Sequence, residues 1–348
     1  MQAVRSLTTL RRRAGAVLVD SFFSGASRLG RMHPLARPER HGVEVIRDVA
    51  YAEEGAHERH RLDVYRPSDG PGPWPTVFYV HGGGFRILSK DTHWIMALSF
   101  ARRGYLVFNV GYRLAPKHPF PAAVEDVAAA YRWMARHGAE YGADLRRLAV
   151  AGESAGANLA TALTLAATYR RAEPFAAGVF ETGVVPRAVL PACGIFQVSD
   201  VDRFARRKPG FPRFLRDRLE EVERGYLGRE PTRHGPTIDF ADPLRWLERA
   251  EPPDRPLPPF FLPVGTKDPL LDDTRRLAAA VRAHGAEAED RYYEGEVHAF
   301  HAFPFLRSSR RCWSHTFAFL ERHVADASLT PPRDDAPTGP RSRGRGTR

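Results

Sequence analysis

The sequence predicts an α/β protein with a mostly parallel central sheet, helices on both faces and a helical cap. Three observations lead to this prediction. Of the 348 residues, 43% are hydrophobic and 27% are charged, the profile of a globular domain. From residue 43, short apolar runs alternate with longer amphipathic segments, as strands and helices do around a parallel sheet. The segment 199–256 departs from this rhythm and is too long for an ordinary crossover.

The elements can be assigned in order along the chain. Strands are expected within 43–51, 60–67, 76–80, 105–114, 148–154, 187–197, 259–265 and 287–295. Helices are expected at 92–103, 121–137, 156–171, 273–284 and about 308–323. The first strands are expected to form a more antiparallel entry to the sheet.

The segment 199–256 is rich in Arg, Pro and aromatic residues, and we interpret it as an insertion. Together with residues 1–40 it is expected to form a helical cap over the carboxyl ends of the strands, where open α/β sheets bind ligands. The alternative is a surface excursion that does not contact a ligand. Residues 41–325 then form the main domain. Residues 326–348 have almost no apolar side chain to bury, and we expect a disordered basic tail.

Residues 10–30 begin with an Arg cluster and continue with apolar residues, as a signal peptide does. Asp20 ends the apolar run after six residues, and Arg28 and Arg31 follow, so we expect neither a signal peptide nor a membrane span. Apolar residues instead recur at helical spacing, namely Leu7, Leu10, Ala14, Val17, Leu18 and Phe22. We expect a helix packed on the body of a cytoplasmic protein. The alternative is weak attachment of this segment to a membrane surface.

The net charge of +11 is concentrated at the two ends of the chain. Residues 1–40 carry +6 and residues 331–348 carry +3, which leaves +2 for the residues between them. A nearly neutral body with basic ends is not typical of a groove that follows nucleic-acid phosphates. We therefore expect no nucleic-acid partner.

Two cysteines exclude a disulfide scaffold. Cys193 lies in the apolar run VLPACGIF and Cys312 lies beside Trp313, so both are expected to be small buried side chains in a reducing compartment. The sequence contains no CxxC motif or Cys/His cluster that would hold a metal ion. We predict neither a metal nor a cofactor.

The pentapeptide Gly152-Glu153-Ser154-Ala155-Gly156 follows a predicted strand and opens a predicted helix. This is the context of the G-x-S-x-G nucleophile elbow. A sharp strand-to-helix turn strains the serine backbone and exposes its hydroxyl at the helix amino terminus, where the dipole favours negative charge. The small residues two positions before and after the serine avoid a clash across the turn. Ser154 is therefore the candidate nucleophile.

His81-Gly82-Gly83-Gly84-Phe85 comes directly after another predicted strand. Consecutive glycines let backbone N–H groups approach a reacting carbonyl oxygen, as an oxyanion hole requires. The residue after the nucleophile, Ala155, would supply a further N–H. The alternative is a flexible glycine turn. We expect His81 to brace the loop rather than to transfer protons.

A nucleophilic serine of this kind needs a base and an acid later in the chain, each at the carboxyl end of a strand. Asp268 follows the strand FFLPVG through the turn TKDP, and His298 follows RYYEGEV, so both fit. Asp272 and Asp273 are competitors for the acid, but we expect them to cap the helix that follows. His301 competes for the base and is expected to be helical.

These motifs together resemble the hormone-sensitive-lipase-like family of α/β-hydrolase carboxylesterases, over roughly residues 60–320. The resemblance includes the stretches YRLAP at 112–116 and HPFPAA at 118–123, with Asp126. In the family, Glu usually follows YRLAP, whereas this chain has Lys117. Whatever that acid braces must therefore be held by other residues.

The elbow also departs from the family pattern, which usually reads GDSAGG or GTSAGG, because this chain has Glu153 and Ala157. These departures leave the subfamily open. The resemblance implies that Gly83 and Gly84 donate to the oxyanion. It also implies an α/β-hydrolase fold and a serine carboxylesterase that forms an acyl-enzyme without a cofactor.

The partner implied is a small-molecule ester. Aromatic residues of the cap are expected to close an apolar pocket for short- to medium-chain esters, namely Phe22, Phe23, Phe204, Phe211, Phe214 and Tyr226. An amidase or arylformamidase-like hydrolase is the nearest alternative, because the same residues hydrolyse amides. A non-catalytic receptor on the same fold is the alternative from another class, and the presence of His298 argues against it.

Overall fold

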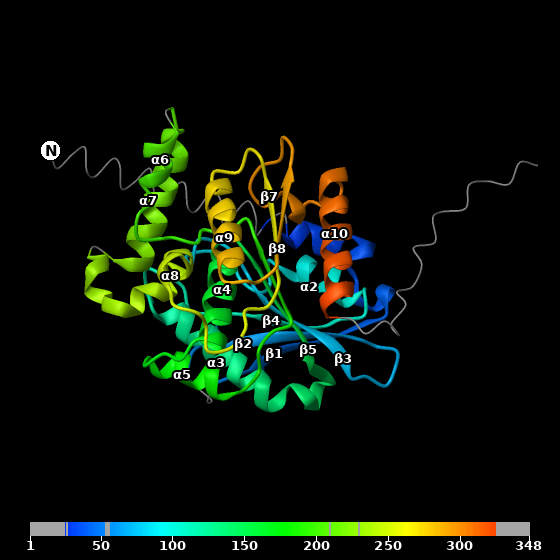
Figure 1. Ribbon diagram of the computed structural model, residues 1–348. Helices are drawn as coiled ribbons and strands as arrows, with labels where there is room; N and C mark the ends of the chain where they lie inside the picture. The colour runs from blue at the N-terminus through cyan, green and yellow to red at the C-terminus, as the bar shows by residue number, and fades with distance from the viewer. Residues whose placement is uncertain (1–24, 26, 53–55, 209, 229, 325–348) are drawn as a thin grey trace, which may run out of the picture.

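An eight-stranded sheet forms the centre of the molecule (Figure 1). The computed structural model describes residues 25, 27–52, 56–208, 210–228 and 230–324. The strands lie in the order β1-β2-β4-β3-β5-β6-β7-β8. Their bounds are β1 Val43–Ala50, β2 Arg61–Pro67, β3 Trp74–Val80, β4 Leu106–Val110, β5 Ala143–Glu153, β6 Ala188–Ala192, β7 Phe260–Gly265 and β8 Ala288–Tyr293.

The sheet is antiparallel where the chain enters it and parallel elsewhere. Strand β2 runs antiparallel to both β1 and β4. The pairs β3–β4, β3–β5, β5–β6, β6–β7 and β7–β8 are parallel. The prediction of a mostly parallel sheet with an antiparallel entry is therefore confirmed.

Helices cover both faces of this sheet (Figure 1). Because side chains alternate along a strand, Phe78 and Val80 of β3 face one core, whereas Val77 and Tyr79 face the other. The larger core is covered by α3 (Ala122–His137), α4 (Ala155–Thr168), α5 (Pro174–Glu181), α8 (Pro243–Arg249) and α9 (Leu271–Ala283). The smaller core is covered by α2 (Trp94–Ala101) and α10 (Arg307–His323).

Several local features differ from the sequence-based expectation; for example, β5 begins at Ala143 instead of residue 148, and β4 ends at Val110 instead of residue 114. Helix α5 was not expected, yet its Ala176 and Val179 are fully buried in the larger core. Strand β6 ends at Ala192 instead of continuing to residue 197. The reason is Cys193, whose φ of +41° leaves the extended conformation and turns the chain away from the sheet.

The segment between β6 and β7 contains α6 (Arg203–Arg207), α7 (Arg213–Leu227), η4 (Pro231–Phe240) and α8. Helices α6 and α7 stand together at one side of the body (Figure 1). Helix α8 instead packs against α4 and α9 of the body, with Leu244 and Leu247 in the larger core. Of the segment expected to form the cap, the last helix therefore packs within the body, and α6 and α7 are left as the candidate cap.

At the amino-terminal end, residues 27–32 are helical and contact the start of α2. The Ser27 hydroxyl accepts a hydrogen bond of 3.0 Å from the Trp94 indole N–H. The remainder of the expected amino-terminal helix and the expected disordered tail lie outside the described residues. No helix in the described part of the chain is long and apolar enough to cross a membrane.

Candidate active site

Ser154 lies at the sharp turn between β5 and α4, with φ +54° and ψ −116°. Two glycines make this turn sterically feasible. A Cβ atom at Gly152 would lie 2.5 Å from the carbonyl oxygen of Gly156, and one at Gly156 would lie 2.1 Å from that of Val80. Both distances are far inside van der Waals contact, so only glycine fits at either position.

The parallel register brings the ends of five strands to one edge of the sheet. Val80 of β3 pairs with Gly152 of β5, and Glu153 of β5 pairs with Ala192 of β6. Gly265 at the end of β7 pairs with Tyr293 at the end of β8. The loops that follow these strands carry the predicted site residues, and they meet at the carboxyl edge of the sheet.

The structure brings the three side chains predicted for a triad together. His298 Nδ1 lies 2.8 Å from Asp268 Oδ2, and His298 Nε2 lies 3.0 Å from Ser154 Oγ. Asp268 is buried, and its Oδ1 accepts a hydrogen bond of 2.8 Å from the N–H of Leu270. Both carboxylate oxygens are thereby fixed, which orients the imidazole toward the serine.

The electrostatics of this relay favour a positive charge on the imidazole. Burial of the ring lowers the pKa of His298, but the neighbouring Asp268 carboxylate outweighs burial and raises this pKa well above its ordinary value. An imidazolium at His298 would therefore be stabilised by the neighbouring carboxylate.

The glycine loop, residues 81–86, follows β3 and lies beside Ser154. Gly83 and Gly84 have φ values of +111° and +58°, and both line the same cavity as Ser154. A Cβ atom at Gly83 would lie 2.1 Å from the carbonyl oxygen of Ile87, so a side chain is excluded there. Ala155, the third predicted donor, is the first residue of α4, where backbone N–H groups have no partner within the helix.

His81 braces the glycine loop, as expected. Its ring is buried and stacks on Tyr112 with centroids 4.1 Å apart. The Tyr112 hydroxyl donates a hydrogen bond of 2.9 Å to the carbonyl oxygen of His81. Burial lowers the pKa of His81 well below its ordinary value, so the ring stays neutral.

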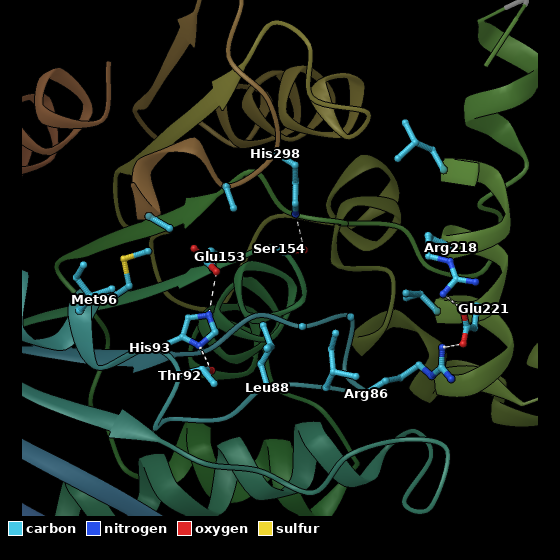
Figure 2. Close-up of a pocket in the computed structure, with 18 of the residues that line it drawn as sticks. Arg86, Leu88, Thr92, His93, Met96, Glu153, Ser154, Arg218, Glu221 and His298 are labelled. Carbon is cyan, nitrogen blue, oxygen red and sulfur yellow. Dashed lines mark hydrogen bonds and ion pairs between the residues drawn. The ribbon is translucent and has the colours of Figure 1, made fainter. Parts of the chain in front are cut away.

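A cavity of about 370 Å³ opens beside Ser154 (Figure 2). Its volume lies near the lower end of the roughly 300–1,000 Å³ that is typical of small-molecule sites. Residues from the glycine loop, α2, α7 and the loop after β8 form its walls. The apolar lining side chains are Ile87, Leu88, Ile95, Met96, Phe214, Leu215, Val222, Ala299 and Ala302.

The expectation of an aromatic pocket was wrong for the described residues. Of the four members of the expected aromatic set that the structure describes, Phe214 alone lines the cavity. Phe204 and Phe211 lie side by side with ring centroids 6.3 Å apart, and Tyr226 stacks on Phe85 at 3.7 Å. These rings support the cap from within, while aliphatic side chains line the cavity. Phe22 and Phe23 lie outside the described residues.

Glu153 of the elbow takes part in contacts that sequence reasoning missed. Its carboxylate oxygens lie 2.9 Å from His93 Nε2 and 3.1 Å from His301 Nε2. Burial alone would raise the pKa of Glu153, but these two partners outweigh it and hold the pKa well below its usual range. Glu153 thus joins the elbow to the start of α2 and to the 3₁₀ turn η5 (Phe300–Ala302).

Cys193 is a second neighbour that the sequence did not reveal. The ligand atoms of Cys193, Asp268 and His298 all lie within 4.8 Å of one another, and in the described part of the chain this is the one group close enough to hold a metal ion. Asp268 and His298 use those atoms in the relay, so a metal ion here would compete with the relay. Burial raises the pKa of the Cys193 thiol, which favours its protonated form. Both cysteines are free and buried, as expected.

The predicted competitors for the acid have other partners. Asp273 is buried and accepts a hydrogen bond of 2.9 Å from the N–H of Phe196, and it pairs with Arg203. Asp272 pairs with Arg207 at 2.6 Å. Both lie in the first turn of α9, but neither caps it, because the N-cap position is Leu270. Asp273 instead ties the cap helix α6 to the body.

The position that is Glu in the family, Lys117, is exposed. The neighbouring Arg113 is held by two other acids. Its guanidinium lies 2.7 Å from Asp126 and 3.4 Å from Glu125, and Asp126 also contacts His60 at 3.1 Å. Asp126 therefore organises this stretch without an acid at position 117.

Sequence comparison places this geometry in a known family. A profile of the alpha/beta hydrolase fold family matches residues 77–302. The chain belongs to this family. This hydrolase is 32% identical over 241 residues to an acetyl esterase of Salmonella paratyphi B, which covers 68% of each chain. It is 34% identical over 227 residues to the esterase LipI of Mycobacterium tuberculosis, which covers 65% of each chain.

Solved structures agree with this assignment. The hydrolase resembles an esterase from the bacterial hormone-sensitive lipase family, with a TM-score of 0.64, 26% identity and coverage of 82% of this chain and 86% of the other. It also resembles the hyperthermophilic esterase of Pyrobaculum calidifontis, with a TM-score of 0.69 and 25% identity. The match covers 92% of this chain and 98% of the other. The predicted fold class and the predicted resemblance to hormone-sensitive-lipase-like esterases are confirmed.

Proposed function

We propose that this hydrolase is a serine carboxylesterase that cleaves short- to medium-chain esters through an acyl-enzyme. Hydrolysis of ester bonds is supported by relatives named as esterases at 32% and 34% identity. The observation that supports the mechanism is the chain of hydrogen bonds from Asp268 through His298 to Ser154. Ser154 lines an apolar cavity together with Gly83 and Gly84.

In the first step, Ser154 Oγ attacks the ester carbonyl carbon while His298 Nε2 accepts the hydroxyl proton. Asp268 holds the imidazole in the tautomer whose Nε2 is unprotonated and then stabilises the imidazolium. Negative charge develops on the former carbonyl oxygen. The backbone N–H groups of Gly83, Gly84 and Ala155 donate to this oxygen.

In the second step, the tetrahedral intermediate collapses and its carbon–oxygen bond to the leaving group breaks. His298 gives its proton to the departing alkoxide, which leaves as the alcohol. A water molecule then loses a proton to His298 and attacks the acyl-Ser154 ester. Collapse of the second intermediate releases the carboxylic acid and returns the proton to Ser154.

The cavity supports the substrate class. Its volume of about 370 Å³ and its aliphatic walls fit a short to medium acyl chain. Each methylene buried contributes about 0.8 kcal/mol until the cavity is full. The proposed location is cytoplasmic, because both cysteines are free and buried. Contact of the basic amino-terminal segment with a membrane surface stays an alternative.

A matched pair of substrates tests this proposal against the amidase alternative. The p-nitrophenyl ester and the p-nitroanilide of one acyl chain differ only in the scissile bond. We expect kcat/KM to be higher for the ester. Faster cleavage of the anilide would favour an amidase, and binding of both without turnover would favour a receptor.

A further inference from the structure

The cap helix α7 contacts the glycine loop along one face. Glu221, Val222, Gly225 and Tyr226 are spaced so that they share this face of the helix. On the glycine loop, the residues that contact this face are 84–86, which directly follow Gly83. Helix α7 also contributes Phe214, Leu215, Arg218, Glu221 and Val222 to the wall of the cavity.

Each of the three loop residues has its own contact with α7. A Cβ atom at Gly84 would lie 2.8 Å from Val222 Cγ2, so the loop backbone lies directly against the helix. The Phe85 ring stacks on the Tyr226 ring, with centroids 3.7 Å apart and an interplanar angle of 5°. Both rings are fully buried.

The third contact is an ion pair that links the loop to the cap. Arg86 Nη1 lies 2.7 Å from Glu221 Oε1, and Arg218 Nη1 lies 2.7 Å from Glu221 Oε2 (Figure 2). The Glu221 side chain is only 10% exposed. A Cβ atom at Gly225 would lie 2.7 Å from Arg86 Nε, so the absence of a side chain on α7 makes room for the guanidinium.

The glycine loop needs such support because glycine has the largest conformational freedom in the unfolded chain and no side chain to pack. Stabilisation of an oxyanion depends on donors that are already in place before the charge develops. A displacement of about 1 Å can cost about 100-fold in rate. Contacts with the neighbouring residues 84–86 are therefore the means by which this chain can fix its N–H donors.

We propose that α7 holds the glycine loop in its working geometry, with Glu221 and Arg86 as positioning residues. This inference rests on the proposed function, since it assigns the support of that oxyanion hole. Glu221 touches no reacting atom and acts through Arg86. Helix α7 thereby lines the cavity and also aligns the backbone N–H donors of the glycine loop. It therefore contributes to turnover as well as to substrate binding.

The test compares Glu221→Gln with Glu220→Gln. The two glutamates are adjacent on α7, and Glu220 pairs with Arg216 and Arg224 of the same helix. We expect Glu221→Gln to lower kcat on a p-nitrophenyl ester by about tenfold or more, with KM changed by less than about threefold, because the ground state makes little use of the oxyanion donors. Glu220→Gln should resemble the wild type.

An inhibitor pair separates positioning from general destabilisation. A trifluoromethyl ketone adds to the serine and places an oxyanion at the donors, whereas the corresponding alcohol occupies the same cavity without forming an adduct. In Glu221→Gln, affinity for the ketone should fall in parallel with kcat, and affinity for the alcohol should not. An equal loss of affinity for both inhibitors would overturn the proposal. A rise in KM with kcat unchanged would also overturn it.

A second variant guards against a folding defect in the first. Arg86→Met removes the other half of the ion pair and should lower kcat similarly, and the double variant should lose little more than either single variant. Additive losses would contradict the pairing. If the wild type hydrolyses esters and Glu221→Gln behaves like Glu220→Gln, only this inference fails. If the wild type turns over no ester, both the proposed function and this inference fail.

Discussion

Ser154 gains its proposed reactivity from its surroundings, because a free hydroxyl is a weak nucleophile. The strained backbone at φ +54° directs the side chain toward His298, whose Nε2 lies 3.0 Å away. Asp268 fixes the other ring nitrogen at 2.8 Å. The structure therefore makes separate predictions for each member of this relay.

The two nearby histidines should differ sharply in their contribution to catalysis. His298→Ala should lower kcat by about 10⁶-fold, because triad members act as a unit. His301→Ala removes a contact with Glu153 and leaves the relay in place, so its kcat should fall far less. Ester turnover and thermal unfolding should be measured on both variants. The opposite ranking in turnover would exclude His298 as the base.

The raised pKa of His298 predicts an alkaline rise in activity. The base accepts a proton only when it is neutral, so kcat/KM should increase as pH rises through the pKa of His298. Because Asp268 raises that pKa, the midpoint should lie above the ordinary value of about 6.5. In Asp268→Asn the midpoint should shift to lower pH and the plateau should fall. A midpoint that is unchanged in this variant would refute the role of Asp268.

Single residues were predictable where a motif carries them. Ser154, Gly83 and Gly84 stand in short patterns whose geometry follows from local chain chemistry. The contacts of Glu153 with His93 and His301 were not predictable, because they join segments 60 and 148 residues apart. Cys193 was recognised as buried, but its position beside His298 depends on the order of the strands.

At the scale of elements, the junction of β5 and α4 is the most constrained. A Cβ atom at Gly156 would lie 2.1 Å from the carbonyl oxygen of Val80, whereas one at Gly138 would meet only ordinary contacts of 3.4 Å or more. Gly156→Ala should therefore lower the free energy of unfolding by about 1–3 kcal/mol or more. Gly138→Ala should change it little. Denaturant unfolding of both variants tests this, and equal stabilities would contradict the packing described for the elbow.

The cavity walls supplied by α2 and α7 predict a preference for acyl length. On p-nitrophenyl esters, kcat/KM should peak at a short to medium chain and fall for long chains, because the cavity of about 370 Å³ fills. Deleting residues 1–40 removes the Ser27 contact with Trp94 of α2 and should broaden this preference. A chain-length series on both proteins is the measurement. A maximum on emulsified long-chain triglyceride would instead indicate a true lipase.

At the scale of the whole molecule, the alternation of apolar runs was enough to predict the sheet and its helices. Each strand of the sheet overlaps its predicted segment, although β5 begins five residues earlier, because buried strands read as apolar runs. Helix α5 was not predicted from the sequence, because its eight residues are too few to show a helical period. The position of α8 within the body was not predictable from the sequence, because it depends on tertiary packing against α4 and α9.

Ser154 is proposed to form the acyl-enzyme, and trapping that intermediate tests the proposal most directly. The protein is quenched in acid during turnover of p-nitrophenyl acetate, digested and analysed by mass spectrometry. We predict one acetyl group on the peptide that contains Ser154 and none in Ser154→Ala, which should remain folded and lose about 10⁶-fold in kcat. Acetylation of another residue, or a folded Ser154→Ala variant that keeps more than about a tenth of the rate, would contradict the account.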